Sequence, residues 1–170
     1  MTSDTTPLTD PNEVLAVVKA STGRRILGLG SLLLLGVLLV YIAVVQSPEI
    51  QWRLFLLVLG VAVLWLADRM RRATETQLEL TETELRDSDG TVIALVDEIE
   101  GMDRGFFAFK PSNGFLLRTK DKGENEWRPG LWWRLGRRIG VGGMTSAHQT
   151  KQMSEILAII MAKRDMAASE

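Results

Sequence analysis

Tryptophan and arginine are concentrated in one short segment of the chain. Residues 127–138 read Trp-Arg-Pro-Gly-Leu-Trp-Trp-Arg-Leu-Gly-Arg-Arg. Arginine binds phosphate oxygens through paired N–H groups, and tryptophan favours the headgroup layer of a bilayer. The segment therefore predicts a surface that binds a lipid headgroup or another phosphate-bearing group. The candidate contacting residues are Arg128, Trp132, Arg134, Arg137 and Arg138.

The same segment has a purely structural interpretation. Residues 74–104 contain ten acidic and two basic side chains, whereas residues 105–151 contain nine basic and three acidic ones. The arginines would then balance the acidic half of the same domain. Trp132 and Trp133 would point to opposite faces of one strand, so that one of them would lie in the core. Both interpretations stay open at this point.

The composition excludes most kinds of catalytic and metal-binding site. The chain has no cysteine and one histidine, His148, so it lacks a thiolate site and a histidine pair. No nucleophile motif or readable pair of base and nucleophile is present. Residues 73–170 carry a net charge of −3, which argues against a nucleic-acid partner. We therefore expect that the protein is not an enzyme and that it has no catalytic residue, metal, cofactor or small-molecule substrate.

Two weaker patterns are better explained by ordinary structural roles than by ligand binding. Gly140-Val-Gly-Gly143 precedes a predicted helix and could offer N–H groups to an anion, but it lacks the lysine of a P-loop, so a turn is the better interpretation. Asp97, Glu98, Glu100 and Asp103 do not have the spacing of a calcium loop and indicate a solvated acidic segment.

Two apolar runs must anchor these side chains at a membrane. Residues 26–45 are uncharged over 20 positions, enough to cross a hydrocarbon core of about 30 Å. Residues 50–67 form a second run if Arg53 reaches the headgroups, so we predict a transmembrane hairpin over residues 26–67. Basic residues flank its outer ends, and the positive-inside rule places both termini in the cytoplasm. These cations are Lys19, Arg24, Arg25, Arg69, Arg71 and Arg72.

The remaining segments follow from local signals. Residues 1–9 are predicted to be a disordered tail, and the Asp-Pro-Asn-Glu start at residue 10 predicts an interfacial helix over residues 10–25. Residues 68–77 are expected to be a tether to a cytoplasmic β-rich domain over residues 78–166. Within it we predict strands over residues 78–85, 91–96, 106–110, 115–119 and 131–139, with a polar loop over residues 97–105.

A closing helix is the clearest element of this domain. Ser146 is its predicted N-cap, and apolar residues recur at helical spacing behind it. Its expected core residues are Met153, Ile156, Leu157, Ile160 and Met161. The fold class is therefore a two-helix transmembrane hairpin plus a small α+β domain. In that domain an antiparallel curled sheet or open barrel is closed by the C-terminal amphipathic helix.

This arrangement resembles a known group of proteins. Two spans, then Leu78-Glu-Leu-Thr-Glu-Thr-Glu-Leu85, a strand leading to Asp97-Glu-Ile99, hairpins and a final helix are similar to bacterial membrane proteins with a cytoplasmic pleckstrin-homology-like domain. The stretches 111–115, 127–134 and 136–143 also resemble uncharacterised small membrane proteins of alphaproteobacteria. The first resemblance implies a seven-stranded domain closed by a helix.

The expected function is that of a non-enzymatic inner-membrane protein. Its cytoplasmic domain would act as an interaction module that contacts lipid headgroups or a protein partner. The alternative is an accessory or assembly subunit of a larger membrane complex, in which the glycine-containing first span packs on another subunit.

Overall fold

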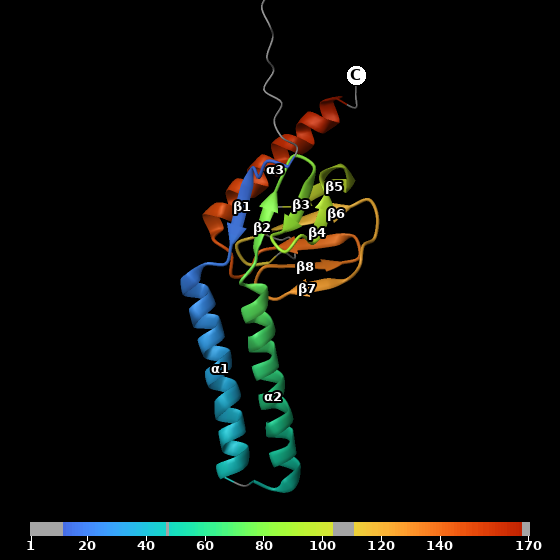
Figure 1. Cartoon of the computed structure of the whole chain (residues 1–170). Helices are drawn as coiled ribbons and strands as arrows, with labels where there is room; N and C mark the ends of the chain where they lie inside the picture. Colours follow the sequence, from blue (N-terminus) through green and yellow to red (C-terminus); the bar gives the residue numbers. More distant parts are fainter. Residues whose placement is uncertain (1–11, 47, 104–110, 168–170) are drawn as a thin grey trace, which may run out of the picture.

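A pair of long helices projects from one end of a β-rich domain (Figure 1). The computed structural model describes residues 12–46, 48–103 and 111–167. The expected tail at residues 1–9 and the expected strand at residues 106–110 lie outside these ranges. The hairpin and the α+β domain expected from the sequence are both present.

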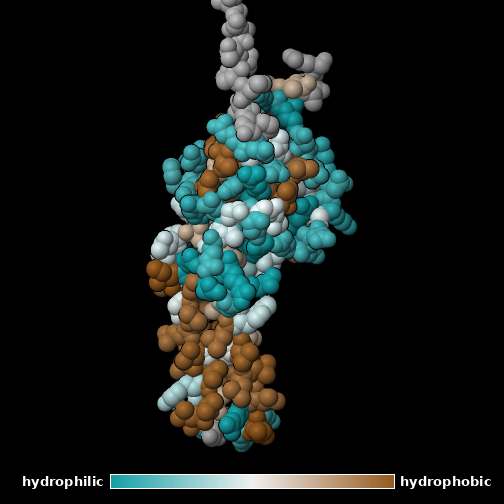
Figure 2. Space-filling model, in the orientation of Figure 1, coloured by the Kyte–Doolittle hydropathy of each residue, from teal (hydrophilic) through white to brown (hydrophobic). Residues whose placement is uncertain are grey.

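The helical hairpin consists of α1 (Thr22–Val45) and α2 (Ile50–Ala73). Within the described residues, both helices are long and apolar enough to cross a membrane. Their outward surfaces are exposed and apolar, and they form a brown column below a mostly teal domain (Figure 2). The helices expected at residues 26–45 and 50–67 are therefore present, and both are longer than predicted.

Small residues bring the two helices together. Gly36 and Ala43 of α1 are buried, as are Gly60 and Ala67 of α2. In each pair the spacing of seven residues is two helical turns, so each helix carries a stripe of small side chains. A Cβ atom added at Gly60 would lie 2.8 Å from Cγ2 of Val40 and 3.3 Å from the carbonyl oxygen of Gly36. The glycines thus allow close contact within the hairpin.

The predicted interfacial helix over residues 10–25 is wrong. Residues 16–19 form strand β1 (Ala16–Lys19), and α1 begins only at Thr22. Ala16 and Val18 are buried in the domain core, while Val17 and Lys19 point away from it. The apolar run fits a helical or a strand period, and its pairing with a strand 60 residues away decided the outcome.

The predicted tether over residues 68–77 is also wrong. α2 continues to Ala73, and β2 (Gln77–Leu80) starts three residues after Thr74. β2 pairs antiparallel with β1, with Lys19 opposite Gln77 and Ala16 opposite Leu80. The hairpin of α1 and α2 is therefore inserted between two neighbouring strands, and the domain begins with β1 and not at residue 78.

The first sheet has the order β1-β2-β3-β4, with β3 (Glu84–Asp87) and β4 (Val92–Leu95). Residues 78–85, predicted as one strand, form a tight hairpin because Thr81 interrupts them. The amide of Glu84 donates to Oγ1 of Thr81 at 3.1 Å. A turn follows β3: the amide of Gly90 donates to the carbonyl of Asp87 at 2.9 Å, and the φ of Gly90 is +92°.

The second sheet has the order β5-β6-β9-β8-β7. Its strands are β5 (Ile99–Asp103), β6 (Phe115–Thr119), β7 (Glu126–Arg128), β8 (Trp132–Leu135) and β9 (Arg138–Val141). Strand β6 confirms the prediction over residues 115–119. The predicted strand over residues 131–139 is two strands, because Gly136 turns the chain at a φ of +59°. The predicted loop over residues 97–105 contains the 3₁₀ turn η1 (Val96–Glu98) and β5.

Helix α3 (Ala147–Ala167) confirms the predicted closing helix. It packs on β1, and its Met153 and Leu157 are fully buried with residues of both sheets. Ile156, Ile160 and Met161 are partly buried against the same core. The described strands form two antiparallel sheets and not a closed barrel. The small α+β domain predicted from the sequence is therefore confirmed.

Candidate functional site

Trp132 is a core residue and does not reach a membrane surface. Its side chain is 2% exposed, between the two sheets. Its Nε1 donates to Oδ2 of buried Asp87 at 3.2 Å, and Oγ1 of Thr76 donates to the same oxygen at 3.1 Å. The prediction of Trp132 as a lipid-contacting residue is corrected: the indole occupies the β8 position that faces inward.

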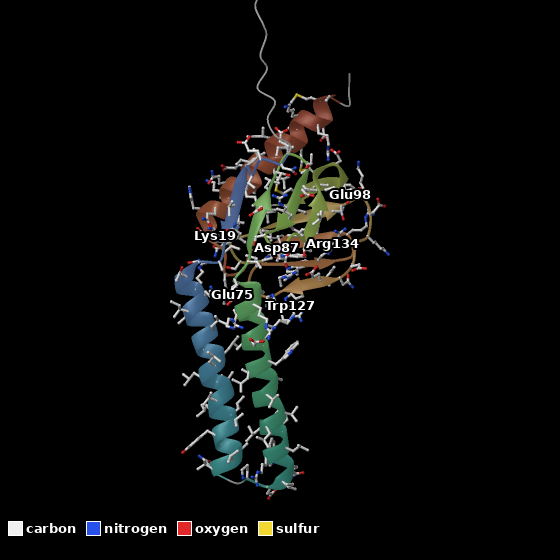
Figure 3. All side chains as sticks on the ribbon, in the orientation of Figure 1. Lys19, Glu75, Asp87, Glu98, Trp127 and Arg134 are labelled. Carbon is white, nitrogen blue, oxygen red and sulfur yellow. The ribbon has the colours of Figure 1, made fainter. Side chains whose placement is uncertain are left out.

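Arg128, Arg134 and Arg137 connect parts of the domain. Arg128 forms ion pairs of 2.8 Å with Asp89 after β3 and with Glu126 on its own strand. Arg134 donates through Nη1 to the carbonyl of Ile93 on the first sheet at 2.7 Å (Figure 3). The third arginine, Arg137, donates to the carbonyl of Thr119 at 2.9 Å and pairs with Glu100 at 3.1 Å. The structural interpretation, with arginines balancing the acidic half, describes Arg128 and Arg137, which pair with Asp89 and Glu100. Arg134 instead binds backbone carbonyls.

The ion pair of Asp89 with Arg128 is charged at neutral pH. Partial burial raises the pKa of Asp89, but the hydrogen bond from the amide of Thr91 and the guanidinium of Arg128 together lower it below its ordinary value. Burial lowers the pKa of Arg128, and Glu126 and Asp89 raise it by more. The pair therefore ties the end of the first sheet to strand β7.

Arg138 differs from the other predicted arginines. It lies on the outer face of the second sheet, directly opposite Arg118 on β6. In the part of the chain that the structure describes, neither guanidinium has an ion pair or hydrogen bond. The two line a hollow of about 480 Å³ together with the acidic residues Glu100 and Asp103 and the apolar residues Met102 and Leu116. Like charges directly opposite each other repel, and Arg138 is the arginine of residues 127–138 that has no ion pair or hydrogen bond within the described residues.

Apolar side chains continue this outer face toward β7. Trp133 lies over Gly140, where an added Cβ atom would overlap the indole ring. Leu135 is 61% exposed on the same face. We call Leu116, Arg118, Trp133, Leu135 and Arg138 the outer face. The sequence analysis missed Arg118 because only the pairing of β6 with β9 brings it beside Arg138.

A second basic and aromatic group lies where α2 meets the domain. Arg69 donates through Nη2 to the carbonyl of Trp127 at 3.3 Å, and its guanidinium lies 5.7 Å from the centre of the Trp65 ring. Figure 3 shows Trp127 beside the end of α2. Both indoles are about half exposed. The sequence analysis used Arg69 only for orientation and left Trp127 out of the candidate residues, since nothing in the sequence places β7 against α2.

The weaker sequence patterns have ordinary structural roles. The amides of Gly142 and Gly143 donate to the carbonyls of Leu131 and Ser112, so they do not face an anion. His148 is exposed near the start of α3. Among the described residues, no group of three or more histidine, cysteine or carboxylate side chains is arranged to hold a metal ion.

Comparisons with protein-family models, curated proteins and solved structures find no match to this chain. The resemblance to membrane proteins with a pleckstrin-homology-like domain stays a prediction.

Proposed function

We propose that the chain is a non-enzymatic membrane protein whose β-rich domain acts as an interaction module. In this proposal the hairpin of α1 and α2 spans the bacterial inner membrane, and both termini and the domain lie in the cytoplasm. The observation that carries the proposal is the way in which the hairpin is connected to the domain. It is inserted between two paired strands, so the domain is held directly at the bilayer surface.

Several contacts support a stiff connection between the helices and the domain. Just before α1, the amide of Ser21 donates to the carbonyl of Met144 at 2.7 Å. The side chain of Met144 occupies the space beside Gly28, between α1 and Met70 of α2. Arg25 of α1 pairs with Glu75, which follows α2, at 3.4 Å. A domain held in this way presents its faces at a constant height above the membrane.

The outer face supports binding of a protein partner. Arg118 and Arg138 supply two guanidinium groups that form no ion pair within the described residues, and Leu135 and Trp133 supply apolar area beside them. Arginine and tryptophan are the side chains most often found at the energetic centre of interfaces. Charge complementarity favours an acidic segment of the partner that also carries apolar side chains.

The alternative function, a subunit of a larger membrane complex, has less support. This alternative requires the glycines of the first span to form a contact surface for another subunit. Gly36 instead contacts α2 of the same chain, and Gly28 accommodates Met144. Gly30 has open space around it, so among Gly28, Gly30 and Gly36 it is the glycine that stays available to another helix.

Photo-cross-linking in cells tests the proposed partner surface. A benzophenone side chain at Leu135 is expected to give one discrete adduct with another protein. The double charge reversal Arg118→Glu and Arg138→Glu is expected to reduce that adduct at least tenfold. Val92 on β4 is a control position, since it is 49% exposed but lies on the other sheet. Equal adducts from both positions, or an adduct unchanged by charge reversal, would contradict the proposal.

A further inference from the structure

A hollow of about 310 Å³ lies at the junction of α2 and β7. It is formed by the last two turns of α2 on one side and by β7 with the residue after it on the other. The lining residues are Arg69, Arg72, Ala73, Glu126, Trp127, Arg128 and Pro129. This hollow is distinct from the outer face and takes no part in the proposed protein contact.

The lining of this hollow is cationic. It contains three guanidinium groups and one carboxylate, that of Glu126. Glu126 pairs with Arg128 at 2.8 Å, and Arg128 also pairs with Asp89 at 2.8 Å. Arg72 pairs with Asp68 at 2.8 Å, but its side chain is 72% exposed. The remaining guanidinium, that of Arg69, contacts a carbonyl and an indole, and no carboxylate in the described chain neutralises it.

The hollow lies at the level where the apolar helices meet the polar domain. Trp65 is 59% exposed and Trp127 is 47% exposed, and indoles favour the interface between hydrocarbon and water. Arg69 is one turn beyond Trp65, a rise of about 6 Å along α2, and Arg72 is nearly one turn further. Figure 2 shows the change from brown helices to teal domain near this level. The guanidinium groups therefore lie at the height of lipid phosphates, given the proposed insertion of the hairpin.

We propose that this hollow binds the phosphate of an anionic phospholipid from the adjacent leaflet. Arg69 and Arg72 contact the phosphate oxygens, and the indole of Trp127 covers the glycerol region. The surplus of positive charge selects an anionic headgroup, since the carboxylate of Glu126 is held by Arg128 and does not receive a choline ammonium group. The proposal rests on the membrane insertion in the proposed function, but not on the protein partner.

Native mass spectrometry of the full-length protein tests the proposal. Detergent-solubilised protein is mixed with phosphatidylglycerol or with phosphatidylcholine, and the lipid retained on each protein ion is measured. Wild-type protein is expected to retain phosphatidylglycerol roughly tenfold better, the scale of one charge-assisted contact. Arg69→Gln is expected to remove most of this preference, and Arg69→Lys to restore part of it, because lysine keeps the charge but loses the fork of donors.

Lys122→Gln is the matched control, since it removes an exposed cation of the β-rich domain that does not line the hollow. It is expected to leave the lipid preference unchanged. Equal retention of the two lipids by wild-type protein, or equal losses in Arg69→Gln and Lys122→Gln, would overturn the proposal. Displacement of the lipid by millimolar inorganic phosphate would also overturn it, in favour of a site for a soluble anion. Extraction of the protein from membranes by alkaline carbonate would instead show that the membrane insertion of the proposed function is wrong, so the two failures are distinguished by separate measurements.

Discussion

The indole of Trp132 links the two sheets through one hydrogen bond and a large apolar contact. Its Nε1 reaches Asp87 at the end of β3, while its ring packs in the core with Val141 and Leu131. Trp133, the next residue, lies on the opposite face of β8, over Gly140. Two adjacent tryptophans thus have different roles, because strand geometry sends consecutive side chains to opposite faces.

Truncation of Trp132 is therefore expected to destabilise the whole domain. Trp132→Ala should lower the free energy of unfolding by about 3–5 kcal/mol, the usual range for a large core side chain. The milder change Trp132→Phe keeps an aromatic ring but loses the donor to Asp87. We expect it to cost about 1–3 kcal/mol, since a buried carboxylate loses a hydrogen bond.

Denaturant unfolding in mild detergent, followed by circular dichroism, measures both changes. Leu135→Ala is the control, because Leu135 is 61% exposed and lies on β8 as well. It should change the free energy of unfolding by less than about 0.5 kcal/mol. If Trp132→Ala and Leu135→Ala were equally mild, Trp132 would not be a core residue.

At the scale of elements, β1 belongs to the domain although both helices separate it from β2. Ala16 and Val18 contribute to the core, and β1 lies between β2 and α3. The amide of Lys19 donates to the side-chain oxygen of Gln149 in the first turn of α3, and the amide of Ser146 donates to the carbonyl of Lys19. β1 is therefore the edge strand that joins the first sheet to the closing helix.

This pairing predicts that the domain can be separated from its hairpin only if β1 is kept. Residues 12–21 joined through a short Gly-Ser linker to residues 74–170 should give a soluble, cooperatively folded protein, because Lys19 and Gln77 are opposite each other. Residues 74–170 alone should aggregate, because β2 would expose an unpaired edge and the buried side chains of Leu78 and Leu80.

Size-exclusion chromatography and amide hydrogen exchange compare the two proteins. In the fusion, the amides of β2 that pair with β1 should exchange slowly. The fragment without β1 serves as the matched control. A fragment of residues 74–170 that is as soluble and as protected as the fusion would show that β1 is dispensable.

At the scale of the whole molecule, the hairpin and the domain form one connected unit. Arg25, Glu75 and Arg71 join the two helix ends, with 2.8 Å between Arg71 and Glu75. The outer face and the hollow beside α2 are both placed by this connection. β7 is the strand of the second sheet nearest the helices, and β5 and β6 lie farther from them (Figure 1).

Orientation in the membrane can be measured directly because the chain has no cysteine. A membrane-impermeant maleimide should label Gln46→Cys, in the turn between the helices, in intact spheroplasts. Lys122→Cys, on an exposed loop of the domain, should react only after permeabilisation. The reverse pattern would place the domain outside the cytoplasm. Labelling of both without permeabilisation, with extraction of the protein by alkaline carbonate, would contradict membrane insertion.

The sequence alone determined the local features of this protein. Long uncharged runs require helices, since an apolar backbone segment of that length satisfies its hydrogen bonds internally. The repeat of Met153, Leu157 and Ile160 predicted α3, and the local sequence of residues 115–119 predicted β6. These signals depend on residues near one another in the chain, and the structure agrees with them.

Only the tertiary structure decided what depends on distant partners. The segment around Val18 fits a helix or a strand, and pairing with Leu78 made it a strand. In the sequence, Arg128, Arg134 and Arg137 could not be distinguished from Arg138. In the structure, carbonyl and carboxylate groups from other parts of the domain bind the first three. Trp127 became part of a candidate lipid site because β7 packs against α2. The chemistry of each side chain follows from its residue type, whereas its exposure and its partners depend on which strands pair and pack together.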